Sequence, residues 1–167
     1  LTIERQVGQT TVMRRRKAEQ RVIPPDPQYI NVDLARFINR VMVKGKKTVA
    51  QRIVYLAMDI VEKQASRPPL EIFQEALRNT TPLLQVKARR VGGATYQIPL
   101  EVPARRGSAM AMRWLITSSR SRTGRPMHEK LAQEFLDASR GEGAAVKRRE
   151  DLHRMADANK AFAHYRW

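Results

Sequence analysis

The fold is decided by the stretch Val86-Lys87-Ala88-Arg89-Arg90-Val91-Gly92-Gly93-Ala94-Thr95-Tyr96-Gln97-Ile98-Pro99-Leu100. Two runs of β-prone residues in it are joined by a pair of glycines. Tight turns that match the twist of paired strands need positive φ angles, which glycine adopts without strain. The stretch therefore predicts a β-hairpin, at about residues 84–102, with lysine and arginine on its strands.

Apolar residues at helical spacing predict three helices before the hairpin. The first runs over residues 31–45, the second begins with a capping box at Thr48 and Gln51, and the third runs over residues 69–81. The expected buried positions of these helices are Leu34, Ile38, Val41 and Met42; Val49, Ile53, Leu56, Ala57, Ile60 and Gln64; and Leu70, Phe73 and Leu77.

Three more helices are expected after the hairpin, over residues 108–118, from Pro126 to the glycines at 141–143, and over about 146–163. Their expected inward positions are Ala111, Trp114, Leu115 and Ser118; Met127, Leu131 and Phe135; and Leu152, Met155, Ala156 and Phe162. The predicted fold class is mainly α, a six-helix bundle with a protruding two-stranded antiparallel β-ribbon arm.

Composition favours a compact protein that binds a polyanion. The chain has 167 residues, 42% of them hydrophobic, which is enough for one domain with a core. Its 32 lysines and arginines exceed 16 acidic residues and give a net charge of +16, which attracts nucleic acid. A membrane surface is less favoured, because no apolar run approaches the ~18 to 20 residues of a membrane span. We expect an N-terminal extension at 1–12, a basic arm at 13–30 and one helical domain at 31–167.

Catalytic and metal-binding motifs are incomplete. The chain has no cysteine and three scattered histidines. His128-Glu129 begins like a zinc-protease motif, but the second histidine of that motif is replaced by Ala132. The sequence before Thr48 ends like a phosphate loop but has Arg40 where that loop needs glycine. His153 and Asp157 lack a third ligand. We expect a protein with no cofactor and no metal that is not an enzyme.

Basic clusters are the candidate binding site. Between residues 86 and 125, nine lysines and arginines face a single acid, Glu101. Arginine suits planar, bidentate contacts with phosphate and guanine. The candidate RNA-binding residues are Arg14, Arg15, Arg16, Lys17 and Arg21 in the arm; Lys44, Lys46 and Lys47 between the first two helices; Lys87 and Arg89 on the ribbon; and Arg105, Arg106, Arg113, Arg120 and Arg122. Tyr96 has two interpretations, stacking on an unpaired base or supporting the ribbon.

Two other classes of protein share some of these sequence features. A DNA architectural protein also combines helices with a basic ribbon, but its ribbon tip usually carries an apolar wedge, and the tip here is Gly92-Gly93. A nuclease needs clustered carboxylates or a histidine pair, and the most basic region has almost no acids. RNA binding without catalysis is the favoured function.

The sequence resembles the bacterial-type family of ribosomal protein seven of the small subunit. The resemblance rests on blocks at residues 31–38, 45–47, 89–99, 109–114 and 145–167, and it covers essentially residues 13–167. Residues 1–12 have no counterpart in the family pattern, and the further C-terminal tail of some members is absent after Trp167.

The resemblance implies a six-helix bundle with a ribbon that binds the 3′ major domain of small-subunit ribosomal RNA and starts assembly of the subunit head. It implies a place near messenger RNA and exit-site transfer RNA, and contact with ribosomal protein eleven of the small subunit. It also implies a bacterial cytoplasm, or an organelle with bacterial-type ribosomes. The residues expected on the messenger and transfer RNA side are Arg90, Gly92, Gly93, Tyr96, Lys147, Arg148 and Arg149.

Overall fold

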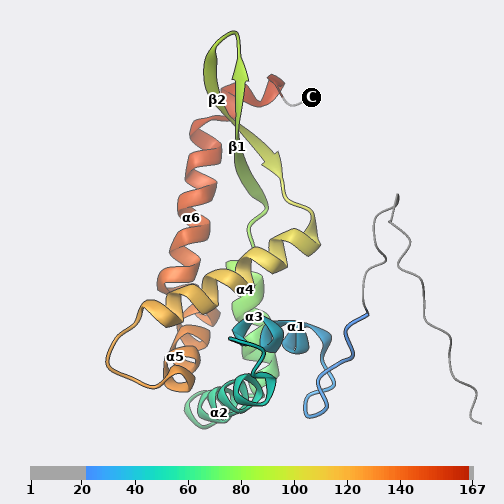
Figure 1. The fold of residues 1–167 in the computed structure, drawn as a ribbon. Helices are drawn as coiled ribbons and strands as arrows, with labels where there is room; N and C mark the ends of the chain where they lie inside the picture. The colour runs from blue at the N-terminus through green and yellow to red at the C-terminus, as the bar shows by residue number, and fades with distance from the viewer. Residues whose placement is uncertain (1–21, 166–167) are drawn as a thin grey trace, which may run out of the picture.

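The computed structural model describes residues 22–165, and in that part of the chain it confirms the predicted fold class (Figure 1). The elements in chain order are α1 Val32–Val41, α2 Lys47–Ala65, α3 Pro69–Thr80, β1 Leu84–Val91, β2 Ala94–Glu101, α4 Ala104–Ser121, α5 Met127–Ser139, α6 Gly143–Ala158 and a short 3-10 helix Lys160–Tyr165. The expected N-terminal extension and the arm residues Arg14, Arg15, Arg16, Lys17 and Arg21 lie outside the described residues.

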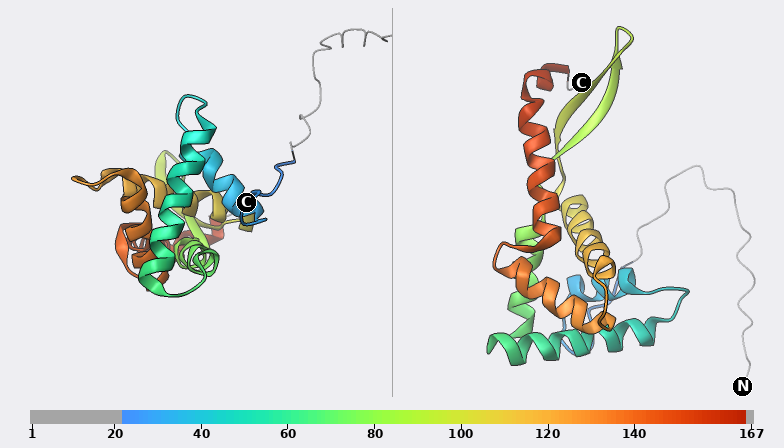
Figure 2. Two further views of the ribbon diagram at one scale, coloured as in Figure 1. Left: turned by 90° about the horizontal axis from the view of Figure 1, so that it is seen from below. Right: turned by 90° about the vertical axis from the view of Figure 1, so that its left-hand side faces the viewer.

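The molecule has a helical body and a projecting arm. Helices α1 to α5 form the body, while α6 and the ribbon rise from it side by side (Figure 2). The 3-10 helix after α6 folds back onto β2 near the ribbon tip. The ribbon therefore has a helix along one side instead of standing alone in solvent.

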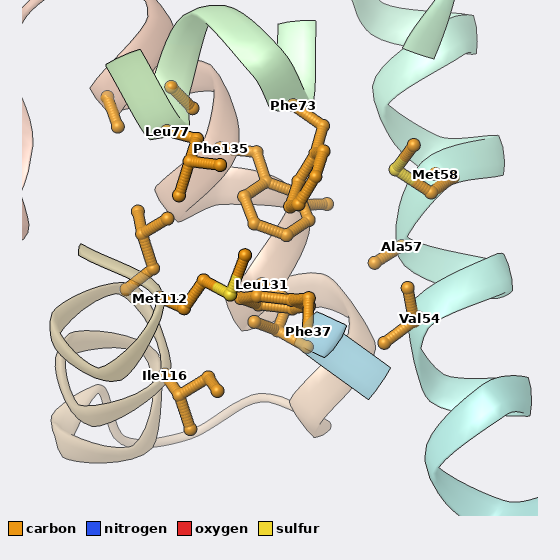
Figure 3. Packing of buried hydrophobic residues seen from close by; sticks show 14 of the residues in the cluster. Phe37, Val54, Ala57, Met58, Phe73, Leu77, Met112, Ile116, Leu131 and Phe135 are labelled. Carbon is orange, nitrogen blue, oxygen red and sulfur yellow. The ribbon is translucent and has the colours of Figure 1, made fainter. Parts of the chain in front are cut away.

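Three phenylalanines form the centre of the body (Figure 3). Phe37 of α1, Phe73 of α3 and Phe135 of α5 are fully buried, and their ring centroids lie 5.4 to 5.5 Å apart. The tilted and edge-on packing of the rings is the arrangement that the aromatic quadrupole favours. This cluster fixes three helices against one another.

The hairpin forms as its turn chemistry predicts. Gly92 and Gly93 have φ angles of +59° and +88° and connect Val91 to its partner Ala94. Positive φ at both central residues belongs to the tight turns that match strand twist. The same register places Arg89 opposite Tyr96.

The predicted buried face of α2 is confirmed only in part. Ala57 is fully buried, and Ile53 and Ile60 are partly buried against the core. Val49 and Leu56 are 50% and 41% exposed, and Gln64 is exposed, which contradicts their expected inward positions. The other buried residues of the helix are Ala50, Val54, Met58 and Val61. The sequence carries two neighbouring apolar stripes, and the core lies between them on the side of the second. The expected capping box is also absent, because the helix already begins at Lys47 and no side chain caps it.

Three other boundaries differ from the expectation. α1 ends at Val41, so Gly45, with φ +74°, lies in the following loop. α4 starts at Ala104, directly after Pro103, and therefore contains Arg105 and Arg106. α6 ends at Ala158 and not near 163. On that helix Met155 is 52% exposed, which contradicts its expected inward position.

A buried carboxylate joins α6 to the body. Glu134 of α5 is 0% exposed, and its Oε1 accepts a hydrogen bond from the backbone N–H of Ala145 in the first turn of α6 at 3.1 Å. Its Oε2 accepts from Arg122 Nη2 at 2.6 Å, and the same nitrogen donates to Asp137 Oδ2 at 2.6 Å. The N–H groups of a first helical turn have no partner within the helix, so this carboxylate stabilises the start of α6.

Candidate nucleic-acid interface

One face of α4 carries a row of arginines. Arg106, Arg113 and Arg120 are spaced by seven residues and all three are exposed. Seven residues make nearly two helical turns, so the three side chains project from one side of the helix. The sequence predicted these residues from charge, and the structure brings them onto one line.

Two arginines of α1, which the sequence analysis did not identify as binding residues, join this face. Arg40 Nη1 donates a hydrogen bond to the carbonyl of Ala109 in α4 at 3.0 Å, which holds Arg40 beside the α4 row. Partial burial lowers the pKa of Arg40, and the nearby charges of Arg113 and Arg36 lower it further. Arg36 and Arg40 are four residues apart, a spacing that places them on one side of α1 and was a usable signal.

A groove of about 610 Å³ separates α1 from the first half of α4. Its basic lining residues are Arg36, Arg40 and Arg105. Ile23, which belongs to the predicted basic arm and follows Arg21 by two residues, also lines the groove. The chain therefore enters the described part of the structure beside the same groove that the arginines surround.

Asp26 fixes this entry point. It is 3% exposed, and its Oδ2 accepts hydrogen bonds from the N–H groups of Gln28 and Tyr29 at 3.2 Å. Its Oδ1 accepts from the Tyr55 hydroxyl of α2 at 2.7 Å. Burial, together with the hydrogen bond to Asp26, raises the pKa of Tyr55 to about 12. The short turn after Pro25 is thus tied to α2.

The lysine loop extends the basic face beyond α1. By this loop we mean Lys44 and Lys46 in the connection between α1 and α2 together with Lys47, the first residue of α2, and all three are exposed. Arg120 Nη2 donates to the carbonyl of Val41 at 3.2 Å, which joins the end of the α4 row to the start of this loop. The loop and the α4 arginines can therefore contact one polyanion together.

The ribbon lies apart from this face, beside α6 (Figure 2). Lys87 and Arg90 are exposed, and Arg89 is half-buried on the same side as Tyr96. The ring of Tyr96 packs against Phe162 of the 3-10 helix with centroids 5.1 Å apart. This contact shows Tyr96 supporting the ribbon, and its stacking on an unpaired base stays a prediction.

Two of the predicted RNA-binding residues form hydrogen bonds to other parts of the protein. Arg122 is bonded to Glu134 and Asp137, as described above. Arg149 Nη1 donates to the carbonyl of Asn79, near the end of α3, at 2.6 Å. Both guanidinium groups have structural partners. Lys147 and Arg148, which precede Arg149 on α6, are exposed.

The histidines and acids do not assemble into a metal site in the part of the chain that the structure describes, where no cluster of three possible ligands occurs. His153 has a structural role, because its Nε2 accepts a hydrogen bond from the backbone N–H of Leu83 at 3.1 Å. That bond ties α6 to the start of the ribbon. Within residues 22–165 no helix combines the length and the apolar character of a membrane span.

Taken together, a helical body with a cationic groove and a basic ribbon defines a class, the helical proteins that bind nucleic acid through a folded basic surface. Comparison with known proteins then gives the family. The family model "Ribosomal protein S7p/S5e" matches residues 13–160, and the chain belongs to this family. The resemblance seen in the sequence is thereby confirmed.

Several curated relatives support the same assignment. The chain is 58% identical over 154 residues to the small ribosomal subunit protein uS7 of Cellvibrio japonicus, which covers 92% of this chain and 99% of the relative. It is 57% identical over 154 residues to the protein of that name from Thermomicrobium roseum, with the same coverage. The corresponding protein of Thermotoga maritima is 55% identical over 155 residues, 93% of this chain and 100% of its own length. Proteins of this family are structural constituents of ribosomes, which confirms the expectation of a binding protein and not an enzyme.

Proposed function

We propose that this protein is a structural constituent of the small ribosomal subunit that binds ribosomal RNA through the surface formed by α1, α4 and the lysine loop. The RNA is the 3′ major domain, and binding there nucleates assembly of the subunit head. The place of action is the ribosome of a bacterial cytoplasm or of an organelle with bacterial-type ribosomes. Residues 31–167 act as one RNA-binding domain, with residues 13–30 as its basic arm.

The observation that carries the proposal is the gathering of like charges around Arg40. Burial, and after it the charges of Arg113 and Arg36, lower the pKa of Arg40, so both neighbouring guanidinium groups repel Arg40 in the free protein. A bound phosphate relieves such repulsion and forms charge-assisted hydrogen bonds with the same groups. Proteins that bind structured RNA use phosphate contacts of this kind to recognise its shape.

The ribbon and α6 form the second half of the proposal. Arg90 lies in β1 next to the Gly92-Gly93 turn, and Lys147 and Arg148 lie in the first half of α6, the helix that rises from the body beside the ribbon (Figure 1). We assign Arg90, Lys147 and Arg148 to the side that faces messenger RNA and exit-site transfer RNA. We also propose that ribosomal protein eleven of the small subunit is a neighbour that contacts this protein. Lys147 and Arg148 lie in the first two turns of α6, where positive charge interacts unfavourably with the helix dipole. A polyanion bound nearby would offset this unfavourable interaction.

Two arginines of the α4 row test the RNA-binding surface. The double variant Arg106→Ala, Arg113→Ala should bind the 3′ major domain RNA at least about tenfold more weakly, and the log-log slope of affinity against salt should become shallower by about 1.5. A matched control, Lys63→Ala in the last turn of α2 with Arg67→Ala in the connection that follows it, removes the same charge from outside the face. Equal losses in both variants, measured by filter binding, would mean that only net charge matters and would overturn the assignment of the face.

A further inference from the structure

The groove between α1 and α4 has features that a surface for duplex phosphates does not require. Ile23 and Ala109, both half-buried, give it an apolar part. Asp33 and Asn39 line it beside the arginines. A phosphate backbone needs neither apolar contacts nor a carboxylate, so these groups point to a different part of a ligand.

Asp33 is the informative residue. Its Oδ1 accepts a hydrogen bond from Arg36 Nη1 at 2.9 Å, and both side chains remain 45% exposed. A carboxylate accepts hydrogen bonds at both oxygens and repels phosphate, whereas the amino and ring N–H groups of a nucleobase are suitable donors to it. The Asn39 amide, which is half-buried, supplies both a donor and an acceptor.

We propose that this groove binds one unpaired nucleotide of the RNA, with the base on the apolar part against Asp33 and Asn39 and the phosphates on Arg36, Arg40 and Arg105. The proposal rests on the RNA-binding function proposed above. The groove volume of about 610 Å³ falls in the range of roughly 300–1,000 Å³ in which proteins enclose small organic ligands. Recognition of RNA commonly uses bases that are splayed out of the helix.

The chemistry of Asp33 sets the base preference. Guanine presents two neighbouring donors, N1–H and the 2-amino group, which match the two oxygens of a carboxylate. Adenine and cytosine present one amino group beside an acceptor nitrogen, and uracil presents one N–H between two carbonyls. The groove should therefore prefer guanine, accept adenine and cytosine less well, and bind uracil least.

Single-stranded pentanucleotides with a central guanine, adenine, cytosine or uracil in a uridine background test this preference by fluorescence anisotropy at fixed salt. The full-length protein should bind the guanine oligonucleotide roughly tenfold more tightly than the uracil one. Asp33→Asn should reduce that ratio to less than about twofold. Asp59→Asn on the exposed face of α2 changes the net charge equally and should leave the ratio unchanged. A melting curve establishes that Asp33→Asn is folded, and Asn39→Ala is the second variant if it is not.

A 6-thioguanosine at the central position locates the base, because sulfur replaces O6 and leaves N1 and the 2-amino group intact. Photocrosslinks should map to peptides of α1 or the first half of α4; crosslinks confined to the ribbon or α6 would overturn the proposal. So would equal affinity for all four oligonucleotides together with tight binding of ribosomal RNA, which would leave the proposed function standing. Failure to bind ribosomal RNA at all would contradict the proposed function, and with it the nucleotide site that rests on that function.

Discussion

Asp26 shows how one side chain can set where a basic arm leaves a folded body. Its carboxylate is buried, and the three hydrogen bonds that it accepts come from its own turn and from Tyr55 of α2. A buried charge is costly unless hydrogen bonds replace its hydration. The position of Ile23 at the groove therefore depends on a residue that makes no contact with the groove itself.

Tyr55→Phe should destabilise the protein by about 1–2 kcal/mol at neutral pH, because Asp26 loses one of its hydrogen-bond donors. Urea unfolding measures the change, with Tyr29→Phe on the neighbouring ring as the control. An unfolding midpoint equal to that of the control would show that the Tyr55 hydroxyl carries no stability.

The same variant has a defined pH dependence. The folded-state pKa of Tyr55 is raised from 10.0 to about 12, so its contribution is complete below pH 10.0 and is lost as the pH rises toward about 12. The unfolded chain ionises this tyrosine first, which favours unfolding in that window. The gap in unfolding free energy between wild type and Tyr55→Phe should therefore narrow between these pH values, and a constant gap would contradict the assigned pKa.

Helix α4 is the element that links the body, the ribbon and the basic face. It follows β2 directly, and it crosses the connection between α3 and β1 at Gly107. A Cβ atom at Gly107 would lie 3.0 Å from Thr81 Cγ2 and 3.2 Å from the carbonyl oxygen of Pro82. The φ angle of Gly107 is not in the left-handed region, so the backbone conformation does not require glycine here. Close packing against Thr81 and Pro82 does.

The substitution Gly107→Ala therefore has two opposing effects on stability. Alanine favours a helix interior by about 1 kcal/mol over glycine, but the new methyl group pushes α4 away from Thr81 and Pro82. We expect net destabilisation and faster hydrogen exchange in the ribbon amides. Thr117→Ala, at an exposed position of α4, raises helix propensity without a clash and should not destabilise. If Gly107→Ala is more stable than wild type, Thr81 and Pro82 can move away from the new methyl group at little cost, which would contradict the need for glycine at this position.

The helices and the ribbon were predictable to the extent that their signals are local. The Gly92-Gly93 turn specifies the hairpin by itself, whereas α2 offers two apolar stripes, and only its partners α3 and α5 decide which is buried. The start of α4 was missed because its first turn has no apolar periodicity. Such choices depend on packing between elements far apart in the sequence.

The candidate site was predictable only in part for a related reason. Charge identified the α4 arginines, but Arg40 joins them through Ala109, which is 69 positions away in the chain. Charge alone also could not separate exposed arginines from Arg122 and Arg149, whose partners are Glu134 and Asn79. Partner residues distant in sequence decide which cations also have a structural role, and RNA contact by Arg122 and Arg149 stays a prediction.

At the scale of the whole molecule, the basic residues that we assign to RNA within residues 22–165 lie in two places. The groove and lysine loop lie on the body, and the ribbon tip lies at the end of the arm that α6 supports (Figure 1). Hydrogen bonds at Ala145, Arg149 and His153 hold α6 to the body and the ribbon. This arrangement suits a protein that binds one folded RNA with its body and extends its arm toward another.

The most direct measurement is the affinity of the protein for isolated 3′ major domain RNA, compared with structured RNA of equal length and with duplex DNA, across a salt series. About eight phosphate contacts predict a log-log slope of roughly −6 to −7 for the cognate RNA. The proposed recognition of RNA shape by the groove and the α4 row predicts a large preference for the 3′ major domain that persists at high salt. Equal binding of all three nucleic acids, collapsing together as salt rises, would contradict the account and leave only nonspecific attraction of a basic protein to polyanions.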